Sequence, residues 1–244
     1  SGGYNHSCAI RANGTLICWG NNIDGQVTAP AGVFSQLSAG SYHNCALGGD
    51  GSISCWGKNS DLQTTPPVNM AGYYVEVSGG ENHTCAIKND GTLSCWGDND
   101  FGQSVPPSGT FKEVSGGGNH TCGIRTDGSV SCWGSNLFGQ SSVPTGKFTE
   151  VSAGRLHTCG LRSNGTLVCW GNNAQGQTGA PGGYFASVTT GTYHSCGISI
   201  FGTAECWGSN SSGQSTPPLG QFAQVSSGAF HNCGVHDDGT MTCW

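Results

Sequence analysis

Histidine, cysteine and tryptophan recur along this chain at a fixed spacing, and they are the residues that could carry chemistry. All 14 cysteines fall into pairs ten residues apart, with a histidine two residues before the first cysteine and a tryptophan directly after the second. The seven pairs are Cys8 with Cys18, Cys45 with Cys55, Cys85 with Cys95, Cys122 with Cys132, Cys159 with Cys169, Cys196 with Cys206 and Cys233 with Cys243. Such groups could form disulfides, bind a metal or transfer protons.

A disulfide in each pair follows from the geometry of a β-hairpin. Residues 6–20 contain two short apolar runs around residues 12–14, where Gly14 can adopt the left-handed conformation that ends a three-residue loop. Counting outward from this turn places Cys8 opposite Cys18 at a non-hydrogen-bonded pair, where Cα atoms lie roughly 4.5 Å apart. A disulfide accepts that distance at the short end of its range. We therefore predict seven hairpins, each joined by one disulfide.

Other chemistries compete with this interpretation. The cysteines could be reduced, buried thiols, or zinc could be held by His6, Cys8 and Cys18 on one hairpin face, although a structural zinc site takes four ligands. The histidines recur in a recurring context, which favours a structural role such as a hydrogen bond to the preceding glycine-rich turn. The sequence has no nucleophile elbow, phosphate-binding loop, paired carboxylate motif or metal-binding repeat. We predict a chain that is not an enzyme and uses no metal or other cofactor.

The elements that position these residues repeat with the same period. First cysteines of successive pairs are 37 residues apart, except for one interval of 40. The three extra residues predict a longer surface loop that runs from residues 60–63 through residues 70–72. Each unit offers about three strands and one polar loop, which is too little to bury both faces of a sheet alone.

Seven such sheets can bury one another's faces if they pack around an axis as a β-propeller. A linear solenoid is the competing geometry. Because the repeats carry no polar capping unit at either end, we predict an all-β, seven-bladed β-propeller with one hairpin disulfide per blade. A period that runs from end to end predicts a single domain over residues 1–244.

The repeat is incomplete where the sequence starts and stops. Residues 1–3 begin just after the aromatic-x-x-aliphatic strand of a unit, and Trp244 stands just before the connecting motif Gly-x-Asn-x-x-Gly-Gln. There are thus seven hairpins and six connecting segments. We expect either that the natural chain continues beyond these residues or that a neighbouring molecule completes one blade by strand addition.

Composition limits the class of partner and the compartment. Charged residues make up only 9% of the chain, and the net charge is −6 with eight Lys and Arg, so we predict no nucleic-acid binding and expect a protein or carbohydrate partner. No apolar run approaches the roughly 20 residues that span a bilayer, which predicts no membrane insertion. Matched cysteines predict an oxidising compartment. The absence of a signal peptide is expected of a mature or trimmed chain.

The motif Ser-x-Gly-x-x-His-x-Cys, followed by Asp-Gly or Asn-Gly and then Cys-Trp-Gly-x-Asn-x-x-Gly-Gln, is similar to the repeat of the regulator of chromosome condensation superfamily. The similarity covers the whole chain and implies a seven-bladed propeller. Departures are Phe201 at the sixth hairpin turn and the absence of a glycine before Gln63. The paired cysteines resemble those of extracellular relatives such as plant receptor kinase ectodomains. The basic surface of the superfamily's nuclear exchange factor has no counterpart here.

Residues 170–173 and 193–195 resemble another member, the secreted β-lactamase inhibitor protein II, which grips its partner with aromatic residues on one rim of the ring. Fold resemblance alone does not carry function. It nevertheless directs attention to positions that differ between units, because packing explains what the units share.

Two sets of variable residues are candidates for binding. The residue before each repeated histidine would lie on one rim, and the large apolar side chains there are Tyr42, Leu156, Tyr193 and Phe230. The alternative is that these side chains pack between blades. Connecting loops provide the second set, Phe101, Leu137 and Phe138, which could serve a protein contact or self-association.

Glycosylation would leave part of this rim bare. Six asparagines begin acceptor sequons: Asn5, Asn13, Asn82, Asn119, Asn164 and Asn210. Glycans on units three and four would cover one side of the rim.

These observations predict a secreted or cell-surface binding or structural module that contacts an extracellular protein or assembles with itself through variable rim loops. A carbohydrate-binding lectin is the first alternative, and an inhibitor of a secreted hydrolase is the second.

Overall fold

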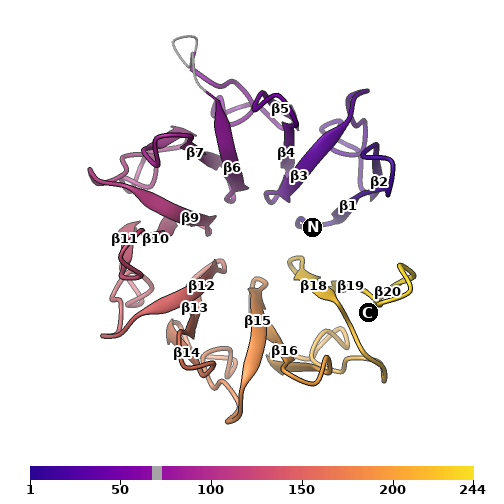
Figure 1. Ribbon diagram of the computed structural model, residues 1–244, viewed down its shortest axis with the longest axis vertical. Coiled ribbons are helices and arrows are strands. Elements are labelled where there is room, and N and C mark those ends of the chain that lie inside the picture. Colours follow the sequence, from indigo (N-terminus) through magenta and orange to yellow (C-terminus); the bar gives the residue numbers. More distant parts are fainter. Residues whose placement is uncertain (68–72) are drawn as a thin grey trace.

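The computed structural model describes residues 1–67 and 73–244, and within these residues it contains strands and turns but no helix. Seven antiparallel sheets surround a common centre (Figure 1). The predicted all-β, seven-bladed propeller is therefore confirmed. The part of the predicted long loop formed by residues 68–72 lies outside the described residues.

Among the described residues, six blades have three strands and one has two. Blade 1 is β1 (His6–Ile10) and β2 (Leu16–Gly20). The others, each in the order first, middle and last strand, are blade 2 with β3 (Phe34–Ala39), β4 (His43–Gly48) and β5 (Ile53–Gly57); blade 3 with β6 (Tyr74–Gly79), β7 (His83–Lys88) and β8 (Leu93–Gly97); blade 4 with β9 (Phe111–Gly116), β10 (His120–Arg125) and β11 (Val130–Gly134); blade 5 with β12 (Phe148–Ala153), β13 (His157–Arg162) and β14 (Leu167–Gly171); blade 6 with β15 (Phe185–Thr190), β16 (His194–Ser199) and β17 (Ala204–Gly208); and blade 7 with β18 (Gln224–Ser227), β19 (Asn232–Val235) and β20 (Met241–Cys243).

Each hairpin has the predicted register. Cys8 pairs with Cys18, and Gly14 has φ of 80° where the loop turns back. All seven predicted disulfides form, with Cα atoms 4.0–4.1 Å apart, slightly closer than the predicted separation. They join Cys8 to Cys18, Cys45 to Cys55, Cys85 to Cys95, Cys122 to Cys132, Cys159 to Cys169, Cys196 to Cys206 and Cys233 to Cys243.

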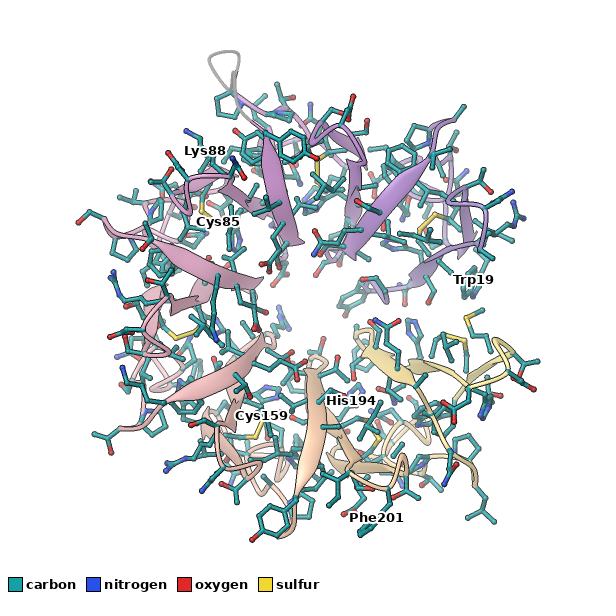
Figure 2. All side chains as sticks on the ribbon, viewed as in Figure 1. Trp19, Cys85, Lys88, Cys159, His194 and Phe201 are labelled. Atoms are coloured by element: carbon teal, nitrogen blue, oxygen red, sulfur yellow. A yellow bond between two sulfur atoms is a disulfide. The ribbon has the colours of Figure 1, made fainter. Side chains whose placement is uncertain are left out.

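No described cysteine is free, which excludes both the reduced-thiol and the zinc alternatives. Figure 2 shows the disulfides within the blades, for example at Cys85 and Cys159. Each bond therefore staples the middle strand of a blade to its last strand.

The repeated histidines connect neighbouring blades. Six of them are buried and His231 is half-buried, and Nε2 of each lies within hydrogen-bond distance of the polar residue that follows the histidine of the adjacent blade. The seven contacts join His6 to Asn44 (2.8 Å), His43 to Thr84 (2.9 Å), His83 to Thr121 (2.8 Å), His120 to Thr158 (2.8 Å), His157 to Ser195 (2.9 Å), His194 to Asn232 (2.9 Å) and His231 to Ser7 (2.7 Å).

The last contact, between His231 and Ser7, joins blade 7 to blade 1. The blades therefore form a closed ring and not a linear solenoid. The structural role predicted for the histidines is confirmed. Each also holds the preceding glycine-rich turn by a hydrogen bond, which its backbone carbonyl accepts; the N–H of Gly40, for example, donates to the carbonyl of His43 at 2.9 Å. The turn also contributes space: a Cβ on Gly40 would clash with Cε1 of His43, so the ring of that histidine fits only against glycine.

A second interblade contact comes from the connecting loops. The Gln140 carbonyl at the end of one loop accepts hydrogen bonds from Nε1 of Trp170 and from Oγ1 of Thr158, at 2.8 and 3.0 Å. Because the Thr158 hydroxyl donates to this carbonyl, it must accept from Nε2 of His120. In the loop before blade 3, which lacks the usual glycine, Leu62 takes a left-handed φ of 64°.

The core is divided among blade interfaces. One cluster joins Phe148 and Val151 of blade 5 to Ile124 of blade 4, and equivalent clusters recur between other neighbours. Burial of apolar surface therefore stabilises contacts between blades more than single blades. No helix in the described residues has the length and apolar character needed to cross a bilayer.

Candidate functional site

The seven turns between the first and middle strands converge at the centre of the ring. Three residues from each turn line a hollow of about 100 Å³, and the last residues of the seven sets are Tyr4, Ser41, Glu81, Gly118, Arg155, Thr192 and Ala229. The backbone N–H of each donates to a carbonyl of the adjacent blade at 2.9–3.4 Å. This circle of hydrogen bonds fixes the backbone, so that the side chains at the hollow are held on a rigid frame.

Aromatic side chains gather beside this hollow. The ring of Tyr4 stacks on Tyr42 and meets Phe230 edge-on, each with centroids 5.4 Å apart, and Tyr193 lies 6.4 Å from Phe230. All four residues are half-buried. We call these four residues the axial cluster. Offset and edge-on contacts hold aromatic rings in defined orientations, and half-buried rings retain a face for a partner.

The axial cluster contains three of the four residues predicted for the rim. Leu156 occupies the equivalent place on blade 5 and is half-buried, but it is the neighbouring Arg155 that contacts Tyr193, with Nη1 3.3 Å from the hydroxyl. Sequence reasoning missed Tyr4 because it considered only the residue directly before the histidine. Tyr4 stands one position earlier in the motif Gly-x-x-His, and reading both variable positions would have found it.

Charged groups accompany the rings. Arg155 of blade 5 reaches across to Glu81 of blade 3, with Nε and Oε2 3.4 Å apart. Lys58 lies 5.5 Å from the centroid of Tyr42. Burial raises the pKa of Tyr42, and the nearby Tyr4 and Glu81 raise it further, so its hydroxyl stays protonated. The site thus offers aromatic faces, a cation, a carboxylate and hydroxyl donors within one opening.

The predicted loop residues form a second set of exposed side chains. Phe101, Leu137 and Phe138 are 47%, 78% and 49% exposed. Their loops are held by glutamine side chains: Oε1 of Gln140, for example, accepts from the N–H of Phe138 at 2.9 Å. Ile23 and Leu62 of the two preceding loops are also exposed. Rigid loops that display apolar side chains suit contact with another protein surface.

The sequon asparagines fall into two groups. Asn5, Asn13, Asn164 and Asn210 are exposed, whereas Asn82 and Asn119 are half-buried. Oδ1 of Asn82 accepts a hydrogen bond from Nζ of Lys58 at 3.1 Å. Their glycosylation remains a prediction.

The interior histidines are unsuited to catalysis. Burial lowers the pKa of His43, His120 and His157 to about 3 and that of His83 to about 4, so these rings are neutral at physiological pH. A side chain that is closed off from solvent also cannot reach a substrate. Among the described residues, no group of three or more His, Cys, Asp and Glu side chains is arranged to hold a metal.

These features define a class of protein, the disulfide-stapled seven-bladed propeller whose variable side chains gather at the central opening. The chain belongs to the regulator of chromosome condensation (RCC1) repeat family, whose model matches more than half of it, over residues 1–26, 34–63, 74–103, 111–140, 148–177 and 222–244. Blade 6 lies between the last two matched ranges. Curated protein sequences provide no match.

Solved structures with the same fold include two plant receptor ectodomains. The entire ectodomain of receptor kinase CR4 from Physcomitrella patens is 26% identical, with a TM-score of 0.85 over 100% of this chain and 71% of that chain. The CRINKLY WD40 ectodomain of receptor kinase ACR4 from Arabidopsis thaliana is 25% identical, with a TM-score of 0.82 over 98% and 92%.

Prp20p from Saccharomyces cerevisiae, 18% identical with a TM-score of 0.81 over 93% of this chain and 79% of that chain, shares the fold. The ectodomains and the seven disulfides together point to an extracellular location. No enzyme family is indicated by these similarities.

Proposed function

We propose that this chain is a non-catalytic binding module of a secreted or cell-surface protein, and that the axial cluster holds an extracellular protein partner. The observation that carries the proposal is the gathering of Tyr4, Tyr42, Tyr193 and Phe230 beside the ion pair of Arg155 and Glu81. Tyrosine, arginine and large aromatic groups dominate binding energy in protein interfaces. Similarity to receptor ectodomains supports the extracellular setting.

Carbohydrate is the second candidate ligand. The stacked rings of Tyr4 and Tyr42 present an apolar face next to Glu81 and Arg155, which can bond hydroxyl groups. A few well-placed polar groups give orientation and specificity in small-ligand sites.

The exposed loop residues Phe101, Leu137 and Phe138 would extend the contact or mediate self-assembly. Glycans on Asn82 and Asn119 would occupy the rim of blades 3 and 4. The axial cluster, which is drawn from blades 1, 2, 6 and 7, would then remain open to a partner.

The test compares three proteins on the same two arrays, one of extracellular protein domains and one of glycans. Wild type is compared with a double variant that combines Tyr42→Ala and Phe230→Ala, and with the control Tyr184→Ala. Tyr184 is 61% exposed and precedes β15, outside the hollow. Ligands of wild type and of the control should lose at least about tenfold affinity for the double variant.

Protein ligands with this pattern would support the proposal, and glycan ligands with this pattern would establish the lectin alternative. Ligands that bind all three proteins equally would exclude the axial cluster as the binding site. Circular dichroism and the unfolding midpoint of each variant would confirm that the fold is retained.

A further inference from the structure

Large apolar side chains project from four consecutive connecting loops. Each loop leads from the last strand of one blade to the next blade, and the residues at its tip vary between blades. The tips of the loops after blades 5 and 6 are small or polar, with Ala174-Gln175 and Ser211-Ser212. The tips of the loops after blades 1–4 carry exposed apolar residues, which we call the apolar arc: Ile23, Leu62, Phe101, Leu137 and Phe138.

The apolar arc lies on the same face as the axial cluster. Each loop begins with a residue whose backbone N–H donates to the carbonyl of the residue before the repeated histidine, as Lys58 does to Tyr42 at 2.9 Å. The loop then ends at a glutamine such as Gln63, whose carbonyl accepts from Nε1 of Trp96 in the next blade at 2.8 Å. Successive loops therefore bridge successive blades around the central hollow and place the apolar arc beside its opening.

Hydrogen bonds within the loops hold these side chains in place. In each of the four loops, Oε1 of the glutamine accepts a backbone N–H at the tip. The donors are Asp24 to Gln26 (2.8 Å), Asp61 to Gln63 (2.9 Å), Phe101 to Gln103 (2.9 Å) and Phe138 to Gln140 (2.9 Å). A surface that is already rigid loses little conformational freedom when a partner binds, and this favours affinity.

Leu62 is displayed in a strained backbone conformation. Its φ is 64°, and among the described residues it is the only residue other than glycine with a positive φ. The other connecting loops have glycine at this position, with φ of 79–84°: Gly25, Gly102, Gly139, Gly176 and Gly213. A large exposed side chain gains nothing from packing that would offset this strain, so a function of the side chain is the better explanation.

Acidic side chains flank the apolar arc. The only cations on this face among the described residues are in ion pairs, Lys58 with Asp61 at 3.7 Å and Arg155 with Glu81 at 3.4 Å. The other cations of the chain lie at hairpin turns or at first strands: Arg11, Lys88, Lys112, Arg125, Lys147 and Arg162. The loop carboxylates that have no ion pair among the described residues are Asp24, Asp98 and Asp100.

The charge of this face selects among possible occupants. A second copy of the chain that met it face to face would bring unpaired carboxylates against unpaired carboxylates, and an anionic lipid surface would repel them as well. Apolar side chains beside unpaired carboxylates are instead complementary to a protein surface on which Arg or Lys stands among apolar residues.

We propose that the apolar arc and its carboxylates form a docking surface for a basic, apolar patch of an extracellular protein. Apolar side chains of the partner pack against Phe101, Leu137 and Phe138, while its Arg or Lys side chains pair with the loop carboxylates. This inference rests on the proposed function, because it specifies the chemistry of the protein that the axial cluster also contacts.

The experiment measures binding of the 244-residue chain to three short synthetic peptides of equal length, which alternate Arg with Leu, Glu with Leu, and Arg with Ser. The chain is produced in a host without N-glycosylation, because Asn82 and Asn119 bond the first residues of two of these loops. Isothermal titration calorimetry should show affinity for the Arg–Leu peptide at least about tenfold above that for either other peptide. This affinity should fall as the salt concentration rises.

The apolar contribution is removed by the double variant Leu137→Ala with Phe138→Gln. This variant gives the loop after blade 4 the tip of the loop after blade 5, Ala174-Gln175, so the fold should be retained. Affinity for the Arg–Leu peptide should fall about fivefold, and its dependence on salt should stay the same because no charge is lost.

The charged contribution is removed by the triple variant Asp24→Asn with Asp98→Asn and Asp100→Asn. Oδ1 of Asp98 accepts the N–H of Asp100, and Oδ1 of Asn172 accepts the same bond in the loop after blade 5, so asparagine preserves the loop. Affinity for the Arg–Leu peptide should fall about fivefold at low salt, and most of its salt dependence should disappear.

Leu62→Gly separates a binding role from a structural one. Glycine relieves the left-handed strain, so the unfolding midpoint should rise. Affinity for the Arg–Leu peptide should nevertheless fall about threefold, because an apolar contact is lost. A Leu62 side chain with only a structural role would leave the affinity unchanged and would argue against the inference.

Matched controls remove the same kinds of group elsewhere. Phe201→Ala removes an exposed aromatic side chain that Figure 2 places at the outer edge of the propeller. Asp90→Asn removes an exposed carboxylate from a hairpin turn, where Asn13 makes the same bonds in blade 1. Both controls should leave the affinity unchanged.

The outcomes distinguish this inference from the proposed function. Absence of binding to the Arg–Leu peptide, equal binding of the three peptides, or equal losses in variants and controls would overturn the inference. Loss only in the double variant Tyr42→Ala with Phe230→Ala would retain the axial cluster and overturn the apolar arc. Loss only in the loop variants would support the apolar arc and exclude the axial cluster. A dimer seen by light scattering and abolished by Leu137→Ala with Phe138→Gln would assign the arc to a second copy and overturn the inference.

Discussion

Blade 5 and blade 1 have the same hairpin, the same disulfide and the same histidine, but they differ in their first strand. In blade 5, β12 accepts from blade 6 through Glu150, donates to blade 4 through Val151 and buries Phe148 against blade 4. In blade 1, only a contact equivalent to the end of this strand is present among the described residues: Oγ of Ser1 accepts from the N–H of Ala39 at 2.9 Å.

The difference shows which contacts hold neighbouring blades of the ring together. Hairpins and disulfides are local, whereas first strands carry the apolar clusters and the hydrogen bonds between blades. The neighbours of blade 1 are accordingly less buried: Val225 is 9% exposed and Cys233 9%, against 4% for Val188 and 0% for Cys196. In the 244-residue chain we expect the ring to open first at blade 1, because the stability of a repeat protein is approximately a sum over the interfaces between its repeats.

The largest expected effect comes from removing an aromatic side chain of a first strand. Phe148→Ala should lower the free energy of unfolding by about 3–5 kcal/mol, because the ring is 1% exposed and leaves a cavity between blades 4 and 5. Phe34→Ala, at the equivalent place beside blade 1, should cost less because Phe34 is already 8% exposed. Guanidinium denaturation of both variants measures the difference, and equal losses would contradict the weakness assigned to blade 1.

Removal of a disulfide should have the next largest effect. Each bridge closes a loop of about ten residues, so replacing both Cys159 and Cys169 by alanine should lower the free energy of unfolding by about 2–3 kcal/mol. When Cys8 and Cys18 are replaced in the same way, we expect the loss to appear as local opening of blade 1, because that hairpin has little else to hold it. Hydrogen exchange resolved by residue distinguishes the outcomes, and uniform loss of protection in both variants would argue against local opening.

The hairpin and its disulfide could be predicted because both depend on residues close in sequence. Gly14 fixes the turn, the turn fixes the register, and the register places Cys8 opposite Cys18. The partner of each histidine could not be predicted in this way, since His6 and Asn44 belong to different blades. The available signal was the polar residue that follows every repeated histidine, which is Ser, Thr or Asn in all seven units.

The candidate binding site was predicted only in part for the same reason. Tyr42, Tyr193 and Phe230 were identified because they occupy a position that differs between repeats, directly before a histidine that all repeats share. Tyr4 joins Tyr42 to Phe230 only when ring closure brings blade 7 next to blade 1. A sequence pattern gives the period of the ring, but contacts across its centre depend on the diameter and tilt that packing sets.

Stability at mild alkaline pH should depend on carboxyl groups of the complete blades. Burial raises the pKa of Glu76 to about 8 and those of Glu113 and Glu150 to about 7, whereas Gln36 and Gln224 flank blade 1. A carboxyl whose pKa is raised on folding stabilises the fold below its ordinary pKa of about 4.5, and this stabilisation is lost as the pH rises toward 8.

Glu76→Gln should remove part of that loss, because Gln36 already accepts the same type of hydrogen bond from Val77. Between pH 6.5 and 8 the free energy of unfolding of this variant should fall less than that of wild type, by on the order of 1 kcal/mol. Urea denaturation at both pH values measures this difference. Parallel pH dependences would show that Glu76 does not titrate in this range. Gln36→Ala serves as the control that removes the hydrogen bond without removing a charge.

The smallest expected effect tests the contact between an arginine of a middle strand and the aromatic ring of a first strand. Arg162→Ala should lower the free energy of unfolding by about 0.5 kcal/mol, because its guanidinium lies over the ring of Phe148 at 5.9 Å. Arg11→Ala should leave stability unchanged in the 244-residue chain, since blade 1 holds no first-strand ring among the described residues. Urea denaturation of both variants measures the difference. An equal loss in both would show that Arg162 acts through contacts within its own hairpin and not through the ring of Phe148.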